Sequence, residues 1–389
     1  MVLRVPRADR GRVGGCWVGR VCRAGSGCRA LGAVDRGRSA RGGRAELWAA
    51  GAAGCGRGGR GGLVTGRQEV DLTAPLGGGT VPNPLSTAAG CAGYGRELAR
   101  FTPLDQLGTL TTRTVLPRAG AGLPGPRIVP VPAGLLNAVG GQNPGIDGFL
   151  RRELPWLAER GVRTVVSIGG HRLEDFADLA ARLSGRDGVR ALELNLSAPG
   201  AADRGLLFAA NPAVSYDVVA AVKAAAPDLP VYAKLAPDTG TVTEVAAACA
   251  AAGADGLSMV NTARGMAIDL DARRPALGGP GGLGGLSGPA LRPIAVHCVF
   301  QVHAAMRAGR MPAVPILAMG GVRTGRDALE LTLAGASGVA VGSELLRDPT
   351  APLRILDELR AELTARGFAA YTDAVGLAHR TTSTKDSDD

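Results

Sequence analysis

The sequence predicts an α/β fold, and specifically a (β/α)8 barrel of the TIM type. From about residue 80, short runs rich in Val, Ile and Leu alternate with amphipathic helical stretches. Several of these runs are apolar at every position, which is typical of parallel strands covered on both faces. Eight such strands with seven following helices favour a closed barrel over a doubly wound open sheet, which is the alternative.

The predicted elements follow one another without large gaps. The strands are expected at 84–89, 108–115, 164–169, 191–196, 231–236, 256–262, 314–319 and 338–343. The helices are expected at 145–160, 172–184, 212–226, 241–253, 288–308, 325–335 and 350–366. The stretch 263–287 is long and rich in Gly and Pro, and we expect it to be an active-site loop.

Three segments of different composition divide the chain. Residues 1–70 hold 14 Arg, no Lys and 4 acidic residues, and their Gly/Arg-rich sequence has no helical or strand period, so disorder is expected. This extension fits a non-functional addition, an Arg-rich transit peptide or an RNA-binding tail. Residues 71–372 are expected to form the barrel, and residues 373–389 a polar tail.

Bulk properties exclude several classes of function. The net charge of +10 belongs to the extension, and the remainder is neutral, so nucleic-acid binding by the body is not expected. An aromatic content of 3% argues against stacking on single strands. No apolar run reaches 18 residues, no signal-peptide core is present, and the seven Cys form no metal motif. A cytoplasmic protein without a membrane span is expected.

Polar residues stand at the predicted carboxyl ends of three consecutive strands. Asn195 ends the fourth strand, Lys234 lies in the fifth, and Asn261 and Thr262 end the sixth. Barrel enzymes keep their catalytic groups at these ends. An Asn there also caps turns, but a buried, unpaired ammonium is costly and needs a reason. The cluster suits a flavin or an amide-rich ring, and it suits a metal poorly.

Glycines follow the last two predicted strands. Gly320 and Gly321 follow the seventh strand, and Gly342 and Ser343 end the eighth. A Gly pair also makes a simple turn, but backbone N–H groups at these two strand ends form the usual phosphate site of barrel enzymes. The sequence therefore predicts a phosphorylated cofactor, and FMN is the best candidate.

Successive motifs give the chain a resemblance to a known family. In order they are NPLSTAAGCAGYGREL, PAGLLNAVGGQNPGID, ELNLSAPG, AKLAPD, VNTARGMAIDLDARRPALGG, GGLSGPALRPIA and AMGGVRTGRDALELTLAGASGVAVGS. From about residue 80 to 370 they resemble the class 1 dihydroorotate dehydrogenases, most closely class 1B. The resemblance implies that FMN lies on the barrel and that dihydroorotate stacks on it and is oxidised to orotate.

The resemblance also implies roles for individual residues. It places FMN against the first flavin loop, the strand ends and the glycines: Ala88, Ala89, Gly90, Arg113, Thr114, Asn195, Lys234, Asn261, Gly288, Gly320, Gly321, Gly342 and Ser343. It places substrate against Asn137, Val139, Gly140, Gly141, Asn195, Asn261 and Thr262. Lys234 is implied to lie near flavin N1, where a cation stabilises the reduced anion.

Several positions depart from the family pattern. The family base is a Cys, and Ala198 stands there, while Gly200 replaces a substrate-binding Asn. Arg113 replaces a Lys, which keeps the charge but changes the hydrogen-bond geometry, and Ala89 replaces a Ser. Ser197 and Cys91 are the candidate substitutes for the base, although adjacent strand residues point to opposite faces.

Three functions remain open from the sequence. The first is a dihydroorotate dehydrogenase that is slow or uses another base. The second is an FMN oxidoreductase acting on another cyclic amide or an enone, since the departures lie on the substrate side. The third is a non-catalytic flavin-binding protein. The resemblance further implies a homodimer and a separate FAD and iron–sulfur subunit, and the acceptor could be NAD, fumarate or a quinone.

Overall fold

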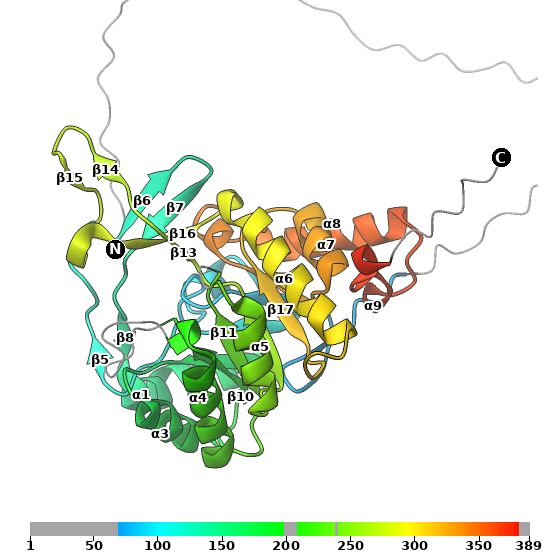
Figure 1. The fold of residues 1–389 in the computed structure, drawn as a ribbon, viewed down its shortest axis with the longest axis horizontal. Coiled ribbons are helices and arrows are strands. Elements are labelled where there is room, and N and C mark those ends of the chain that lie inside the picture. Colours follow the sequence, from blue (N-terminus) through cyan, green and yellow to red (C-terminus); the bar gives the residue numbers. More distant parts are fainter. Residues whose placement is uncertain (1–68, 198–207, 238–239, 381–389) are drawn as a thin grey trace, which may run out of the picture. The chain divides into compact units, whose positions relative to one another are not determined.

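The computed structural model describes residues 69–197, 208–237 and 240–380, and in them eight parallel strands close into a barrel (Figure 1). The order around the barrel follows the chain, and pairing of the last strand with the first closes it. The strands are β3 (Leu85–Thr87), β4 (Thr109–Thr111), β9 (Thr164–Ile168), β10 (Val189–Asn195), β11 (Val231–Leu235), β12 (Gly256–Met259), β17 (Ile316–Met319) and β18 (Gly338–Val341). The predicted fold class is confirmed.

Helices between the strands cover the outside of the barrel (Figure 1). They are α3 (Leu173–Leu183), α4 (Pro212–Ala225), α5 (Val242–Ala251), α6 (Arg292–Arg307), α7 (Gly325–Ala334) and α8 (Ala351–Ala365). Local signals fix their starts: Asn211 accepts hydrogen bonds from the N–H groups of Ala213 and Val214, and Thr324 accepts one from Asp327. The predicted helix 145–160 is instead divided into α1 (Gly145–Gly148), a π-helical segment (Phe149–Glu153) and α2 (Leu154–Ala158).

The strand register separates an apolar outer face from a polar interior. Paired residues on neighbouring strands point to the same side, and side chains alternate along each strand. One face carries Leu192, Leu194, Leu257 and Val339, which are fully buried beneath the helices. The opposite, inward face carries hydroxyls, and Thr109 Oγ1 donates to Ser86 Oγ at 2.8 Å. The barrel interior therefore accepts polar groups that an apolar core would reject.

A hairpin closes the amino-terminal end of the barrel. Its strands are β1 (Ala74–Leu76) and β2 (Gly79–Val81). The Leu76 side chain fills the space beside Gly338, where an added Cβ would lie 2.3 Å from Leu76 Cδ1. The N–H of Gly77 donates to the Tyr232 hydroxyl at 3.0 Å. This plug leaves the carboxyl ends of the strands as the end that is available for ligands.

An antiparallel sheet accompanies the barrel, and it corrects one prediction. The sheet order is β13 (Ala263–Gly265), β16 (Gly284–Ser287), β7 (Gly134–Asn137) and β6 (Ile128–Val131). The stretch 263–287 was expected to be a loop, but it contributes β13, β16 and the hairpin β14 (Ile268–Asp269)–β15 (Arg274–Pro275). Short two-stranded pairing also joins β5 (Ala119–Gly120) to β8 (Asn143–Pro144). The pairing of β16 with β7 joins segments about 150 residues apart in the chain, which a local sequence pattern does not reveal.

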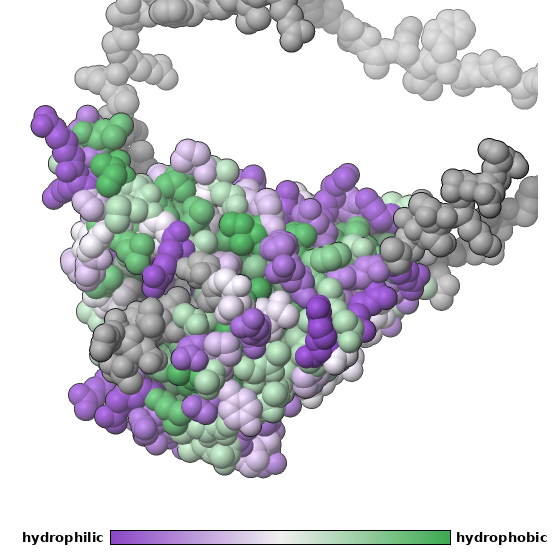
Figure 2. Space-filling view, in the orientation of Figure 1, coloured by the Kyte–Doolittle hydropathy of each residue, from purple (hydrophilic) through white to green (hydrophobic). Residues whose placement is uncertain are grey.

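The β14–β15 hairpin projects at the upper left of Figure 1, and Figure 2 shows hydrophobic residues among charged ones on it. Its exposed apolar side chains are Met266, Ile268 and Leu270.

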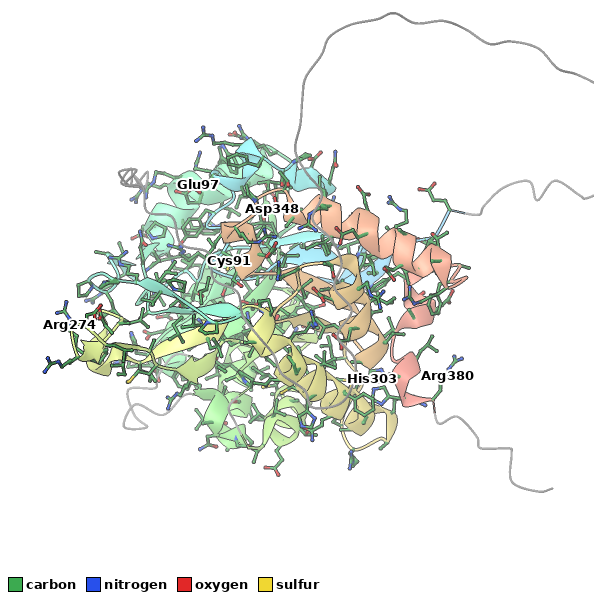
Figure 3. All side chains as sticks on the ribbon, turned by 90° about the horizontal axis from the view of Figure 1, so that it is seen from above. Cys91, Glu97, Arg274, His303, Asp348 and Arg380 are labelled. Carbon is green, nitrogen blue, oxygen red and sulfur yellow. The ribbon has the colours of Figure 1, made fainter. Side chains whose placement is uncertain are left out.

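At the other end of the chain, α9 (Tyr371–Ala374) buries Tyr371, and His303 lies near the segment that carries Arg380 (Figure 3). Within the described ranges, no helix is long and apolar enough to cross a membrane. The domain boundaries at 70 and 372 stay predictions, and most of residues 1–70 lies outside the described residues.

Candidate active site

The three polar residues predicted at consecutive strand ends lie together. Asn195 is the last residue of β10 and is paired in register with Lys234 of β11. Asn261 follows β12 and donates its backbone N–H to the carbonyl of Leu235 at 2.8 Å. Its side-chain amide donates to Asn195 Oδ1 at 3.3 Å. The two amides and the ammonium therefore occupy one edge of the barrel, at its carboxyl end.

A chain of hydrogen bonds fixes the orientation of Asn195. Its amide nitrogen donates to Thr114 Oγ1 at 3.2 Å, and Thr114 Oγ1 lies 3.0 Å from Ser167 Oγ. Asn195 Oδ1 accepts from Asn261 and from the N–H of Ser197 at 3.3 Å. Ser167 is absent from the predicted set, although a Ser inside a buried strand was a signal for it. The network holds the Asn195 side chain in one orientation before any ligand arrives.

Lys234 is buried beside a carboxylate that the sequence analysis did not assign to the site. Lys234 is 4% exposed and Glu193 is 1% exposed, and Lys234 Nζ lies 3.5 Å from Glu193 Oε2. Two charges so far from water are costly, and their mutual attraction offsets part of that cost. The pair explains how an ammonium is kept inside the barrel, and a charged residue in the middle of a predicted buried strand could have revealed it.

Arg113 borders the first loop, which follows β3. Its guanidinium donates to the Gly90 carbonyl at 3.1 Å and to Gln142 Oε1 at 3.2 Å. Arg127 also donates to Gln142 Oε1, at 3.2 Å, so two cations converge on one neutral amide oxygen. Neither Gln142 nor Arg127 is in the predicted set. The arrangement keeps positive charge at the rim of the strand ends.

Cys91 lies in the same loop, in the middle of the barrel in Figure 3. Burial raises the pKa of its thiol to about 11, and the positive charges of Lys234 and Arg113 lower that pKa by less. A thiol with this pKa is protonated at neutral pH and is a poor proton acceptor. Cys91 is therefore a weak candidate for the missing base.

The glycines at the ends of β17 and β18 are adjacent, because these strands pair in register up to Met319 and Ala340. Gly320 and Gly321 have φ of +132° and +73°, and a Cβ on Gly321 would lie 2.8 Å from the Gly288 carbonyl oxygen. Only glycine fits this close approach. Gly342 lies beside the first loop, since its added Cβ would be 3.4 Å from Ala88 Cβ, and Ser343 follows it. Ala88, Ala89 and Gly90 follow β3, which pairs with β18.

The predicted substrate residues divide into two groups. Asn137 and Thr262 meet over Gly285: Asn137 donates to the Gly285 carbonyl at 3.1 Å, and Thr262 Oγ1 would lie 2.1 Å from an added Gly285 Cβ. Thr262 also donates its N–H to Asn261 Oδ1 at 2.9 Å, which joins this group to Asn195. The turn Val139–Gly140–Gly141 instead packs on Leu123 and Leu116.

The base position predicted from the resemblance, Ala198, lies outside the described residues, as does Gly200. Ser197 is described, and its hydroxyl is buried without a hydrogen-bond partner among the described residues. A serine base needs a neighbouring group that accepts its proton. In the part of the site that is described, Ser197 has no such activation.

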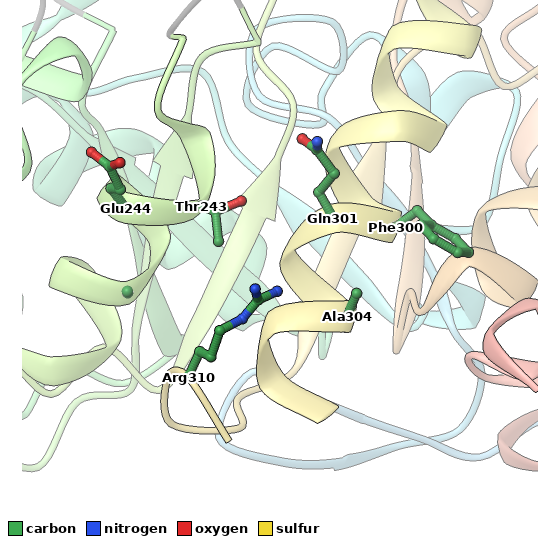
Figure 4. Close-up of a pocket in the computed structure, with 7 residues that line it drawn as sticks. Thr243, Glu244, Phe300, Gln301, Ala304 and Arg310 are labelled. Carbon is green, nitrogen blue, oxygen red and sulfur yellow. The ribbon is translucent and has the colours of Figure 1, made fainter. Parts of the chain in front are cut away.

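A separate groove of about 530 Å³ lies between α5 and α6 (Figure 4). It is lined by Thr243, Glu244, Ala247, Phe300, Gln301, Ala304 and Arg310. These residues lie on the outer helices and in the loop after α6, and none of the predicted site residues lines the groove. The groove is therefore distinct from the strand-end cluster.

Comparisons with known proteins agree with this geometry. The sequence model of the family described as dihydroorotate dehydrogenase matches residues 72–363. The chain is 44% identical over 313 residues to the "dihydroorotate dehydrogenase B (NAD(+)), catalytic subunit" of Desulforudis audaxviator, covering 80% of this chain and 99% of that protein. The proteins of the same name from Geobacter sulfurreducens and Bacillus cereus are 42% and 39% identical, and each match covers 98% of the relative and 79% or 80% of this chain. The resemblance stated from the sequence motifs is confirmed: the chain belongs to the dihydroorotate dehydrogenase family, oxidoreductases of pyrimidine biosynthesis that act on a CH–CH bond.

Proposed function

We propose that this protein binds FMN and oxidises (S)-dihydroorotate to orotate. The observation that carries the proposal is the cluster of Asn195, Lys234 and Asn261 at adjacent strand ends, in a chain of this family. Two oriented amides suit a cyclic substrate that carries amide groups of its own, and a buried ammonium suits a group that gains negative charge.

The residues present fit FMN in three respects. Lys234 is a buried cation, which suits a reduced flavin anion. Gly90 has φ of +91°, and nothing lies within 4 Å of an added Cβ, which leaves open space beside the first loop. The paired glycine ends of β17 and β18 suit a phosphate. In the proposal, Ala88, Ala89, Gly90, Arg113, Thr114, Asn195, Lys234, Asn261, Gly288, Gly320, Gly321, Gly342 and Ser343 hold the cofactor.

The reaction makes one C5=C6 double bond and removes two hydrogens. When bound, FMN supplies an acceptor at N5 for the hydride that leaves C6. The chain has to orient the substrate, and the C5 proton needs an acceptor. Asn137, Asn195, Asn261 and Thr262 orient the ring through amide and hydroxyl contacts, and Val139, Gly140 and Gly141 border it. Asn195 is held ready by its bonds to Thr114 and Asn261.

No described side chain is suited to accept the C5 proton. Ala198 has no group that accepts a proton, Ser197 lacks an activating neighbour among the described residues, and the Cys91 thiol is protonated at neutral pH. A positioned general base contributes roughly 10²–10⁴-fold to a rate. We therefore propose a slow dehydrogenase whose C5 proton passes to water.

The names of the relatives support a partner subunit, while its cofactors and a homodimer are what the family resemblance implies. Each relative is called a catalytic subunit, and NAD(+) is part of its name. We infer that this chain delivers its electrons to a separate FAD and iron–sulfur subunit, with NAD as the final acceptor, and that it forms a homodimer. A cytoplasmic location stays a prediction.

A substrate panel tests the proposal. Full-length protein loaded with FMN is assayed with dihydroorotate and with dihydrouracil, using an artificial electron acceptor, and with a simple enone, using an artificial electron donor. We expect slow turnover of dihydroorotate alone, and we expect Ala198→Cys to raise it by about 10²–10⁴-fold. Faster turnover of dihydrouracil or of the enone would favour an FMN oxidoreductase that acts on a different substrate. FMN binding without turnover in both proteins would favour a non-catalytic flavoprotein.

A further inference from the structure

The ion pair between Glu193 and Lys234 lies within the barrel, beneath the strand-end cluster. Side-chain exposure is 1% for Glu193 and 5% for Lys234, and the charged atoms are 3.5 Å apart. Lys234 is paired in register with Asn195 on one side and with Ser258 on the other. Glu193 is two residues before Asn195 on β10, so its backbone lies roughly 6–7 Å deeper in the barrel. The backbone of Lys234 is thus level with the cluster, and that of Glu193 lies below it.

The carboxylate acts on nothing else that the structure describes. Neither Glu193 oxygen has a hydrogen-bond partner among the described residues, and the Ser258 hydroxyl next to Lys234 has none either. A distance of 3.5 Å is longer than the ~2.7–2.9 Å of a charge-assisted hydrogen bond. In an ion pair that only stabilises the fold, we would expect Nζ to approach the carboxylate to hydrogen-bond distance and both carboxylate oxygens to accept hydrogen bonds. The geometry is instead that of an ammonium held by charge and available to a second anion.

Depth prevents Glu193 from touching a ligand itself. A ligand at the strand ends meets Asn195 and Asn261, which are joined by a hydrogen bond, and Lys234 at the same level. Glu193 is separated from that ligand by the Asn195 layer. Glu193 can then influence the ligand in two ways: through the position of Lys234, and directly through the field of its carboxylate, which would destabilise a reduced flavin anion.

We propose that Glu193 is a positioning residue that keeps the Lys234 side chain directed toward the bound flavin. This inference rests on the proposed function, because it takes the flavin to be the second anion. Without the counter-charge, a buried ammonium is expected to turn toward water. Less positive charge then reaches the flavin, and its reduced form is less stable.

The test is a double-mutant cycle on the midpoint potential of bound FMN. The four proteins are the wild type, Glu193→Gln, Lys234→Met and the double variant. We expect Glu193→Gln to lower the potential by most of the fall seen in Lys234→Met, and not to lower it further once Lys234 is replaced. Glu193→Asp should restore part of the wild-type potential. The affinity for FMN, measured in parallel, should fall in the same variants that lower the potential.

A matched control is the pair of Lys223 and Asp255, whose atoms lie 3.0 Å apart near the surface. Asp255→Asn should leave the potential unchanged. The proposal is overturned if Glu193→Gln leaves the potential unchanged or raises it, or if it shifts the potential equally in the Lys234→Met background. Should Glu193→Gln fail to fold, Glu193→Asp replaces it in the cycle. The potential of Glu193→Asp is then compared with that of the wild type, and the same comparison is made in the Lys234→Met background.

Failure of the proposed function gives a different result. A protein that binds no FMN, or whose potential is insensitive to Lys234→Met, would contradict the placement of the cofactor beside Lys234. A potential that responds to Lys234→Met but not to Glu193→Gln would retain the proposed function and remove only the role of Glu193.

Discussion

Gly90→Ala is the substitution that separates folding from cofactor binding most cleanly. Gly90 has φ of +91°, and an added Cβ would meet nothing within 4 Å. Its cost to the folded protein is therefore only the backbone strain of a non-glycine residue, about 1–2 kcal/mol. In the proposal the open space belongs to the flavin, and a methyl group forced into a well-packed contact costs about 1–3 kcal/mol. That is a loss of roughly 5- to 150-fold in FMN affinity.

Two other glycines provide the controls. Gly309 has φ of +66° and also has nothing within 4 Å of an added Cβ, but it lies in the loop after α6. Gly321 has φ of +73°, and its added Cβ would be 2.8 Å from both Arg292 Cβ and the Gly288 oxygen. Gly309→Ala should match Gly90→Ala in the free energy of unfolding, while Gly321→Ala should lose a further ~1–3 kcal/mol.

The assay is titration of apoprotein with FMN, followed by flavin fluorescence, together with urea unfolding of the same samples. Gly90→Ala should weaken FMN binding, while Gly309→Ala should not. Equal FMN affinity in Gly90→Ala and Gly309→Ala would refute the reasoning, because the space beside the first loop would then not be occupied by the cofactor.

Three further predictions concern single side chains. Cys91→Ser should change turnover by less than about threefold, because a thiol with a pKa of about 11 is not a base at pH 7 to 8. A steady-state assay checks this, and a loss of about 100-fold would identify Cys91 as the base. Burial, with smaller contributions from His379 and Arg307, lowers the pKa of His303 to about 4. Because the unfolded chain then binds a proton more readily than the folded one, the free energy of unfolding falls as the pH drops from about 6.5 toward 4. Between pH 7.5 and pH 5.5, the free energy of unfolding measured in urea should fall less for His303→Gln than for the wild type. His297 is exposed, and His297→Gln should show the same fall as the wild type. Tyr371→Phe should lower the free energy of unfolding by about 1–3 kcal/mol, because the fully buried hydroxyl donates to the Ala336 carbonyl and accepts from Thr332, each at 3.1 Å; an unchanged value in urea unfolding would contradict this.

The barrel could be predicted because its signals are local. Most of the parallel strands are short apolar runs bounded by turns, and the helices between them show a helical period. The strand-end rule then brings Asn195, Lys234 and Asn261 together without any coordinates. Their grouping in the structure follows from the order β10–β11–β12.

The antiparallel sheet could not be predicted in the same way. β6 and β7 have exposed or half-buried residues at most positions, and they exist because β16 pairs with β7 across about 150 residues of chain. Glu193 shows the same limit at the site. Its charge was visible in the sequence, but its contact with Lys234 depends on the register of two strands. Ala198 marks a further limit, because its family role comes from the resemblance and the residue lies outside the described residues.

The most direct measurement of the central claim is a single anaerobic turnover. Full-length protein carrying oxidised FMN is mixed with dihydroorotate, and flavin bleaching and orotate formation are followed together. We predict slow bleaching with one orotate formed for each FMN reduced, and faster bleaching in Ala198→Cys. Tightly bound FMN that bleaches in neither protein would contradict the assignment of dihydroorotate as the substrate.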